Sequence, residues 1–87
     1  MEWDNLRYFL EVARAGRLTT AARRLAVDHT TVSRRLQALE KSMGLQLFLC
    51  EPGGYKLTEA GRNLLPRVEA MESASVAIEH SLPSMGD

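Results

Sequence analysis

The side chains that could do chemistry lie in one polar stretch, residues 27–40, which reads VDHTTVSRRLQALE. Val32, Leu36 and Leu39 in this stretch are spaced to lie on one face of a helix. The opposite face presents hydrogen-bonding groups from His29, Thr30, Thr31, Ser33, Arg34 and Gln37, with Arg35 to one side. Arginine can bind guanine in a bidentate manner, and hydroxyl and amide groups can reach base edges. The pattern predicts a helix that contacts DNA.

Catalytic and metal-binding patterns are not found. His29 and His80 have no nucleophile or carboxylate partner at a recognisable spacing, so we expect no enzyme. The single cysteine, Cys50, cannot form an internal disulfide, and no metal-ligand spacing is present, so no metal or cofactor is expected. No apolar run could span a bilayer, and the start MEWDNLRYF lacks the features of a signal peptide. We expect a cytoplasmic protein, associated with the nucleoid when bound to DNA.

Charge is unevenly distributed along the chain. The 87 residues carry 11 basic and 11 acidic side chains, so the net charge is zero. Residues 14–41 hold seven basic and two acidic residues (7 − 2 = +5), whereas residues 59–87 hold two basic and five acidic ones (2 − 5 = −3). A basic segment joined to an acidic one is compatible with a nucleic-acid contact surface joined to something else. With 45% hydrophobic residues, one small domain is feasible.

The spacing of apolar residues predicts three helices, at about residues 4–15, 19–25 and 28–43. Together these helices must position the polar stretch. Their predicted limits are capping residues: Asp4 and Asp28 at two N-termini, Gly16 and Gly44 at two C-termini. Thr19 and Thr20 begin the second helix, where one can cap and its neighbour can touch a phosphate.

The second and third helices have the spacing of a helix-turn-helix. Small or apolar residues occupy the fourth, eighth, tenth, fifteenth and eighteenth places counted from Leu18: Ala21, Leu25, Val27, Val32 and Leu36. This arrangement lets two short helices cross steeply, with the N-terminal half of the second in the major groove. The ninth place, often glycine, is Ala26.

A hairpin and a long helix follow. Residues 45–58 carry β-formers on both sides of EPGG, which predicts two strands and a turn. Thr58 can cap a last helix that reaches about Ser81, with a kink or local loosening at Pro66. This helix carries a heptad seam: Leu64, Val68, Met71, Ser75, Ile78 and Leu82. The seam predicts pairing of two subunits; the alternative is packing against the rest of the same chain.

Several segments resemble the DNA-binding domain of LysR-type transcriptional regulators: LRYFLEVA, AARRL, TVSRRLQALE, GLQLF and LTEAG. The resemblance covers about residues 3–82. It implies a mainly α fold, with a winged helix-turn-helix over residues 1–58, a linker and dimerisation helix over 59–82, and a tail over 83–87. It also implies a larger effector-binding domain, not contained in these residues, through which a small molecule acts on the full-length protein.

The family's DNA contacts, carried over by position, fall on His29, Thr30, Ser33 and Arg34. Its wing tip falls on Gly53 and Gly54. The family commonly has glutamine and proline at His29 and Thr30, so base preference should differ. It also usually has basic residues at Cys50 and Gly53, which leaves Lys56 as the positive charge of the wing. We therefore expect fewer phosphate or minor-groove contacts from this wing than is usual in the family.

These observations predict sequence-specific binding of double-stranded DNA by a homodimer, with the third helix in the major groove of an inverted-repeat-like site. One alternative is a protein-interaction module, in which the helix-turn-helix is a scaffold and the long helix binds a partner. Zero net charge favours it, and it predicts no salt-dependent affinity for DNA. Another alternative is a different winged-helix repressor that is complete without an effector domain.

Overall fold

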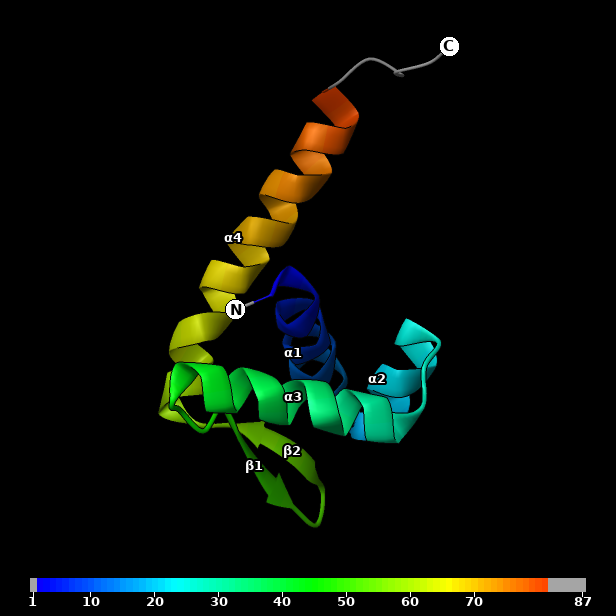
Figure 1. The fold of residues 1–87 in the computed structure, drawn as a ribbon, viewed down its shortest axis with the longest axis vertical. Helices are drawn as coiled ribbons and strands as arrows, with labels where there is room; N and C mark the ends of the chain where they lie inside the picture. The colour runs from blue at the N-terminus through cyan, green and yellow to red at the C-terminus, as the bar shows by residue number, and fades with distance from the viewer. Residues whose placement is uncertain (1, 82–87) are drawn as a thin grey trace.

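A computed structural model of the protein describes residues 2–81. The elements follow the chain as α1 (Trp3–Ala15), α2 (Leu18–Leu25), α3 (His29–Met43), β1 (Phe48–Glu51), β2 (Gly54–Leu57) and α4 (Glu59–Ser81). Figure 1 shows α3 lying across α1, the β1–β2 hairpin on one side of this group, and α4 rising away from it on the other. The predicted mainly α fold with a two-stranded wing is confirmed. Leu82 and the predicted tail, 83–87, lie outside the described residues.

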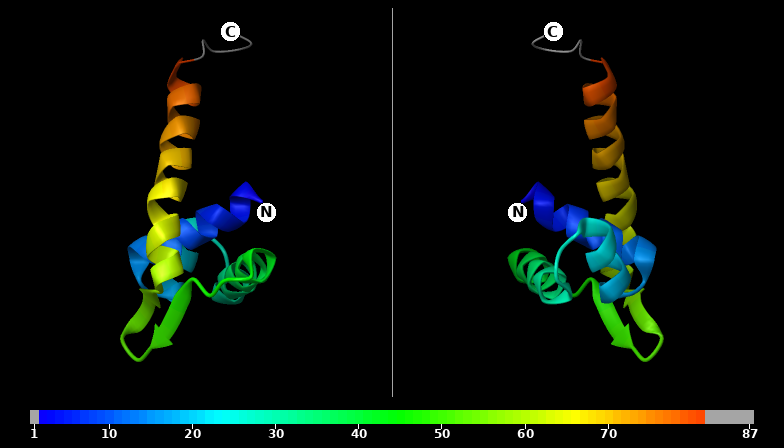
Figure 2. Two further views of the ribbon diagram at one scale, coloured as in Figure 1. Left: turned by 90° about the vertical axis from the view of Figure 1, so that its left-hand side faces the viewer. Right: turned by 90° about the vertical axis from the view of Figure 1, so that its right-hand side faces the viewer.

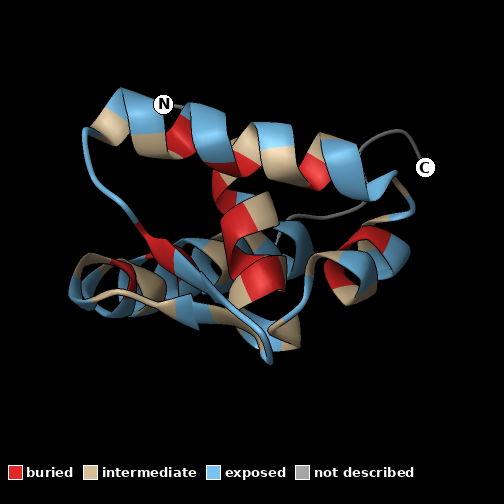
Figure 3. Cartoon of the chain, turned by 90° about the horizontal axis from the view of Figure 1, so that it is seen from below, coloured by how far each residue is buried: buried red, intermediate tan, exposed pale blue. Residues whose placement is uncertain are grey.

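The hydrophobic core forms around α1, which contacts α2, α3, β2 and α4. Its largest fully buried side chains are Phe9, Leu10, Val12, Val32, Leu39, Leu47 and Val68. Figure 3 shows these buried residues concentrated where the helices face one another, with exposed residues on the outer side of α3. The inward face predicted for α3 is confirmed, because Val32, Leu36 and Leu39 are all buried.

Helix limits agree with the predicted ones at the C-termini and differ at two N-termini. Gly16 and Gly44 end α1 and α3 in the left-handed conformation, as predicted. The N-cap of α1 is Glu2 rather than Asp4, which lies in the first turn with its carboxylate 3.4 Å from Arg7. The N-cap of α2 is Arg17, so neither predicted threonine caps this helix.

The wing is an antiparallel hairpin whose base is held by α1 and α3. Phe48 pairs with Leu57, and the centre of the Phe48 ring lies 5.3 Å from the centre of the Phe9 ring. Glu40 of α3 accepts hydrogen bonds from the backbone N–H groups of Leu47, at 2.7 Å, and Phe48, at 3.4 Å. The carboxylate of Glu40 therefore fixes the point at which the chain leaves α3 and enters β1.

The start of α4 is joined to the wing and the core. Thr58 caps the helix as predicted, because its hydroxyl oxygen accepts a hydrogen bond of 3.0 Å from the backbone N–H of Gly61. Gly61 is buried, and a side chain there would collide with the carbonyl oxygen of Leu47. The helix continues through Pro66, although proline supplies no backbone donor at that turn. None of the helices in the described residues is long and apolar enough to cross a membrane.

The second half of α4 extends beyond the core. The two side views of Figure 2 show its last turns rising beyond the other elements. Its attachment to α1 includes a two-bonded ion pair, in which Arg14 donates to Glu72 at 2.8 and 3.2 Å. The bond from Arg14 lowers the pKa of Glu72. Past this pair the helix is exposed on nearly all sides.

Candidate nucleic-acid interface

Helices α2 and α3 form the predicted helix-turn-helix. The turn between them places Ala26 in the left-handed region, at φ 57°, where glycine is the usual residue. The backbone N–H of Val27 donates to the carbonyl of Ala22 at 3.0 Å, which closes the turn. Ala21 and Ala22 are both buried. Their small side chains let the backbones of α2 and the core helices approach.

The outer face of α3 is polar and accessible. His29, Thr30, Arg34 and Gln37 are exposed, and Ser33 and Thr31 are half-buried. A shallow hollow on this surface is lined by Thr31, Arg34 and Arg35. The surface can therefore present hydroxyl, amide, imidazole and guanidinium groups together, and groups of this kind can hydrogen-bond to base edges in the major groove.

Arg35 lies at one edge of this face and is partly engaged with α1. Its guanidinium donates to the side-chain oxygen of Asn5 at 3.2 Å and lies 5.5 Å from the centre of the Tyr8 ring. Such contacts hold the guanidinium in place, and its remaining N–H groups stay available to a phosphate. Asn5 and Tyr8 have no part in the sequence prediction, because their proximity to Arg35 depends on how α1 crosses α3.

The wing lies beside the start of α2. Lys56 and Gly53 are exposed, whereas Gly54 is half-buried. A side chain at Gly54 would collide with the carbonyl oxygen of Gly16, and the adjacent N–H of Tyr55 donates to that oxygen at 2.7 Å. Glycine at position 54 thus has a packing reason in addition to its predicted DNA contact.

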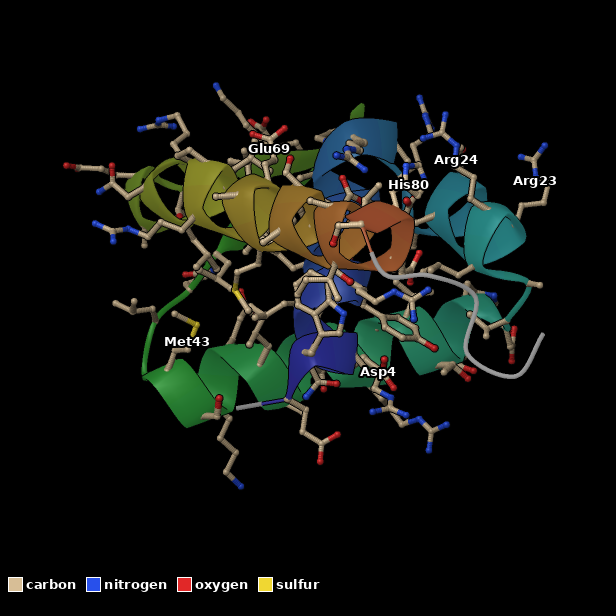
Figure 4. The ribbon with its side chains drawn as sticks, turned by 90° about the horizontal axis from the view of Figure 1, so that it is seen from above. Asp4, Arg23, Arg24, Met43, Glu69 and His80 are labelled. Atoms are coloured by element: carbon tan, nitrogen blue, oxygen red, sulfur yellow. The ribbon has the colours of Figure 1, made fainter. Side chains whose placement is uncertain are left out.

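A shallow pocket joins the wing to α2. It is lined by Arg17 and Thr19 on one side and by Cys50, Pro52 and Gly54 on the other. Arg17 is exposed here, and its place beside the wing makes it an additional candidate for a phosphate contact. Sequence periodicity could not identify it, because this proximity depends on the wing folding back onto the turn after α1. Thr19 is exposed and Thr20 is half-buried in the first turn of α2. Arg23 and Arg24 project outward from the end of α2 (Figure 4).

Asp28 occupies the predicted N-cap position of α3, but its side chain makes no capping bond to the backbone. One carboxylate oxygen instead accepts a hydrogen bond of 2.7 Å from the Thr30 hydroxyl, and the other lies 3.3 Å from Nδ1 of His29. The bond from Thr30 lowers the pKa of Asp28, and the charge of His29 acts in the same direction. The carboxylate is therefore ionised near neutral pH, next to two residues predicted to read bases.

The predicted dimer seam on α4 divides into two parts. Val68 is fully buried in its own chain and Leu64 is half-buried against the same core, so Val68 has no surface to offer a second subunit. Met71 and Ile78 are 47% and 57% exposed, and Ser75 is half-buried. Trp3 of α1 lies against this face and lines an apolar groove with Met71, Ser75 and Ile78.

Residues 3–62 match the family of bacterial regulatory helix-turn-helix proteins described as the lysR family. The chain belongs to the LysR family. Among its LysR-type relatives, the Mau operon transcriptional activator of Paracoccus denitrificans is 42% identical over 78 residues, which cover 90% of this chain and 28% of the relative. LysR-family proteins such as this activator are transcriptional regulators rather than enzymes.

Solved LysR-family structures show the same fold. The DNA complex of the CbnR DNA-binding domain has a TM-score of 0.82 at 36% identity, covering 93% of this chain and 94% of that one. The complex of the BenM DNA-binding domain with catB site 1 DNA has a TM-score of 0.88 at 29% identity, with coverages of 92% and 90%. The chain spans about a quarter of the length of the curated LysR-type relatives it matches. It corresponds to their DNA-binding domain.

Proposed function

We propose that this DNA-binding domain recognises a specific duplex sequence as a homodimer, with α3 in the major groove of each half of an inverted-repeat-like site. The polar outer face of α3 carries the proposal, since His29, Thr30 and Arg34 are exposed together at its N-terminal half. Side chains in that half reach base edges when a helix-turn-helix docks. We infer that Arg17, Thr19, Thr20, Arg35 and Lys56 contact the DNA backbone and fix the register of the domain on the duplex.

The dimer is proposed from the exposed half of α4. Met71 and Ile78 are large apolar side chains that the described chain leaves in solvent, next to a groove lined by Trp3. Two copies that pair through this face would be related by a twofold axis, which makes an inverted repeat the matching DNA symmetry. In a longer protein, a small molecule acting on a further domain would regulate this binding, and the protein would act in the cytoplasm at the nucleoid.

Selection of bound duplexes from a randomised DNA pool tests the proposal. The selected duplex is then titrated at two salt concentrations, because phosphate contacts make the logarithm of the affinity fall linearly with the logarithm of salt concentration. Recovery of an inverted repeat, bound more weakly at high salt, is the expected result. A pool without enrichment would instead favour the protein-interaction alternative, in which the exposed face of α4 binds another protein.

Arg34→Ala tests the assignment of α3 as the reading helix. We expect a loss of about 1–3 kcal/mol in binding to the selected duplex, together with relaxed preference at one base position. The matched control is Arg67→Ala, which removes an exposed arginine from α4 and should leave base preference unchanged. Fluorescence anisotropy measures both, and equal affinities for the Arg34→Ala variant and the wild type would contradict the assignment.

A further inference from the structure

The carboxylate of Asp28 contacts side chains where an N-cap residue would ordinarily contact the backbone. The first main-chain bonds of α3 run from the N–H groups of Thr31 and Val32 to the backbone oxygen of Asp28, at 3.0 and 3.3 Å, and the carboxylate adds no capping bond. Both side-chain oxygens are directed to Thr30 and His29. These are two of the exposed residues on the proposed reading face.

The contact with Thr30 determines what its hydroxyl can do toward DNA. An ionised carboxylate only accepts hydrogen bonds, so the 2.7 Å contact requires that Thr30 be the donor. A hydroxyl has one hydrogen, and here Asp28 binds it. The oxygen of Thr30 therefore faces a ligand with its lone pairs alone, as an acceptor.

The contact between Asp28 and His29 likewise influences whether His29 donates or accepts a hydrogen bond. An unprotonated Nδ1 would place its lone pair 3.3 Å from a carboxylate oxygen, which is repulsive. The contact therefore favours the forms that carry a hydrogen on Nδ1, which are one neutral tautomer and the imidazolium. In the neutral ring the other nitrogen, Nε2, is then an acceptor.

Building on the proposed function, we infer that Asp28 is a specificity-determining residue, which sets Thr30, and His29 in its neutral form, as hydrogen-bond acceptors toward the base edges. In the major groove only the amino groups of adenine and cytosine are donors. The half-site should therefore have adenine or cytosine at the positions that these two residues meet. The charge of Asp28 also repels phosphates, so the same residue lowers affinity for DNA of any sequence.

Three variants separate the effect of the Thr30 hydroxyl acting as an acceptor from the effect of the negative charge of Asp28. Asp28→Ser keeps a residue suited to the N-cap position but removes the charge and shortens the reach to Thr30. Asp28→Asn removes the charge and retains an oxygen that can accept from Thr30. Thr30→Val removes the hydroxyl and keeps the charge. Glu69→Gln is the matched control, since Glu69 lies on the side of α4 turned away from α3 (Figure 4).

The experiment repeats the duplex selection with each variant at about pH 8, where histidine is ordinarily neutral, and measures affinity for a mixed-sequence duplex. Asp28→Ser and Thr30→Val should both reduce the preference for adenine or cytosine at the same position, by about five- to tenfold. Asp28→Ser and Asp28→Asn should raise affinity for the mixed duplex by roughly threefold. Glu69→Gln should leave that affinity unchanged, and Asp28→Asn should retain most of the preference.

The outcomes distinguish this inference from the proposed function. If the wild type enriches a defined site and Asp28→Ser selects the same bases with the same discrimination, Asp28 does not determine specificity. If the wild type enriches no sequence, the proposed function itself fails. Circular dichroism checks that Asp28→Ser is folded; should it unfold, the contrast between Asp28→Asn and Thr30→Val decides the matter.

Discussion

The two halves of α4 differ in what surrounds them. The first half is packed against the wing and the core, with Gly61 and Val68 buried. The second half carries Met71, Val76 and Ile78, which are 44–57% exposed. The first half of α4 thus completes the fold of its own chain, and the second half exposes apolar side chains to solvent. Substitutions in the first half should alter folding, whereas those in the second half should alter association.

The largest effect is expected when charge is placed on the exposed half. Met71→Asp together with Ile78→Asp should weaken self-association by at least about a hundredfold, because an apolar interface would have to bury unpaired carboxylates. The fold of the monomer should be retained, since neither residue belongs to the core. Sedimentation velocity measures the association, and thermal melting checks the fold. A dimer of unchanged affinity would show that this face is not the interface.

A matched pair of valines compares the two halves directly. Val68→Ala should lower the free energy of unfolding by roughly 2–3 kcal/mol, because it removes buried methyl groups and leaves a cavity. Val76→Ala removes the same atoms from an exposed site and should change stability by less than about 0.5 kcal/mol. Urea unfolding of both variants, at a concentration where the protein is monomeric, measures the difference. Equal values would mean that Val68 contributes no more to the fold than Val76.

Gly61 tests how closely the first half of α4 is joined to the chain before the wing. Alanine ordinarily stabilises a helix relative to glycine. Gly61→Ala should nevertheless destabilise the protein by about 1–2 kcal/mol, because the new side chain collides with the backbone of Leu47. At Gly53 a side chain meets nothing within 4 Å, so Gly53→Ala is the control and should be nearly neutral. A stabilising Gly61→Ala would contradict the close approach.

The smallest effect is expected at the boundary between the two halves, where Arg14 bonds to Glu72. The pKa of Glu72 is lowered in the folded chain, so the contribution of this pair is present above the ordinary glutamate value of 4.5 and is lost as the pH falls below it. Glu72→Gln should be less stable than the wild type at neutral pH and nearly equal to it at about pH 3. Because both side chains are partly exposed, the difference in the free energy of unfolding between the variant and the wild type should be small. A constant difference across this pH range would exclude the ion pair as its source.

Local patterns predicted most of the fold. The spacing of Ala21, Val32 and Leu36 identifies the helix-turn-helix because it reflects helical geometry within one short stretch. Contacts between distant segments were not predictable in this way. Periodicity grouped Val68 with Met71 and Ile78 on one face of α4, but could not tell that Val68 is buried in its own chain whereas Met71 and Ile78 are exposed. Similarly, Asp28 is of a residue type typical of an N-cap, and only the structure shows that its carboxylate bonds to Thr30.

The attachments of the wing have a consequence for the DNA. Glu40 holds the entry to β1, and the carbonyl of Gly16 holds β2 through Tyr55. The wing and α3 therefore approach a duplex as one rigid body with little conformational entropy left to lose. A site whose groove width does not match this body must deform elastically to be bound, and that deformation energy depends on base sequence. The stiffness of the DNA segment between the wing and α3 depends on its base sequence. It would therefore contribute to selectivity at base pairs that no side chain touches.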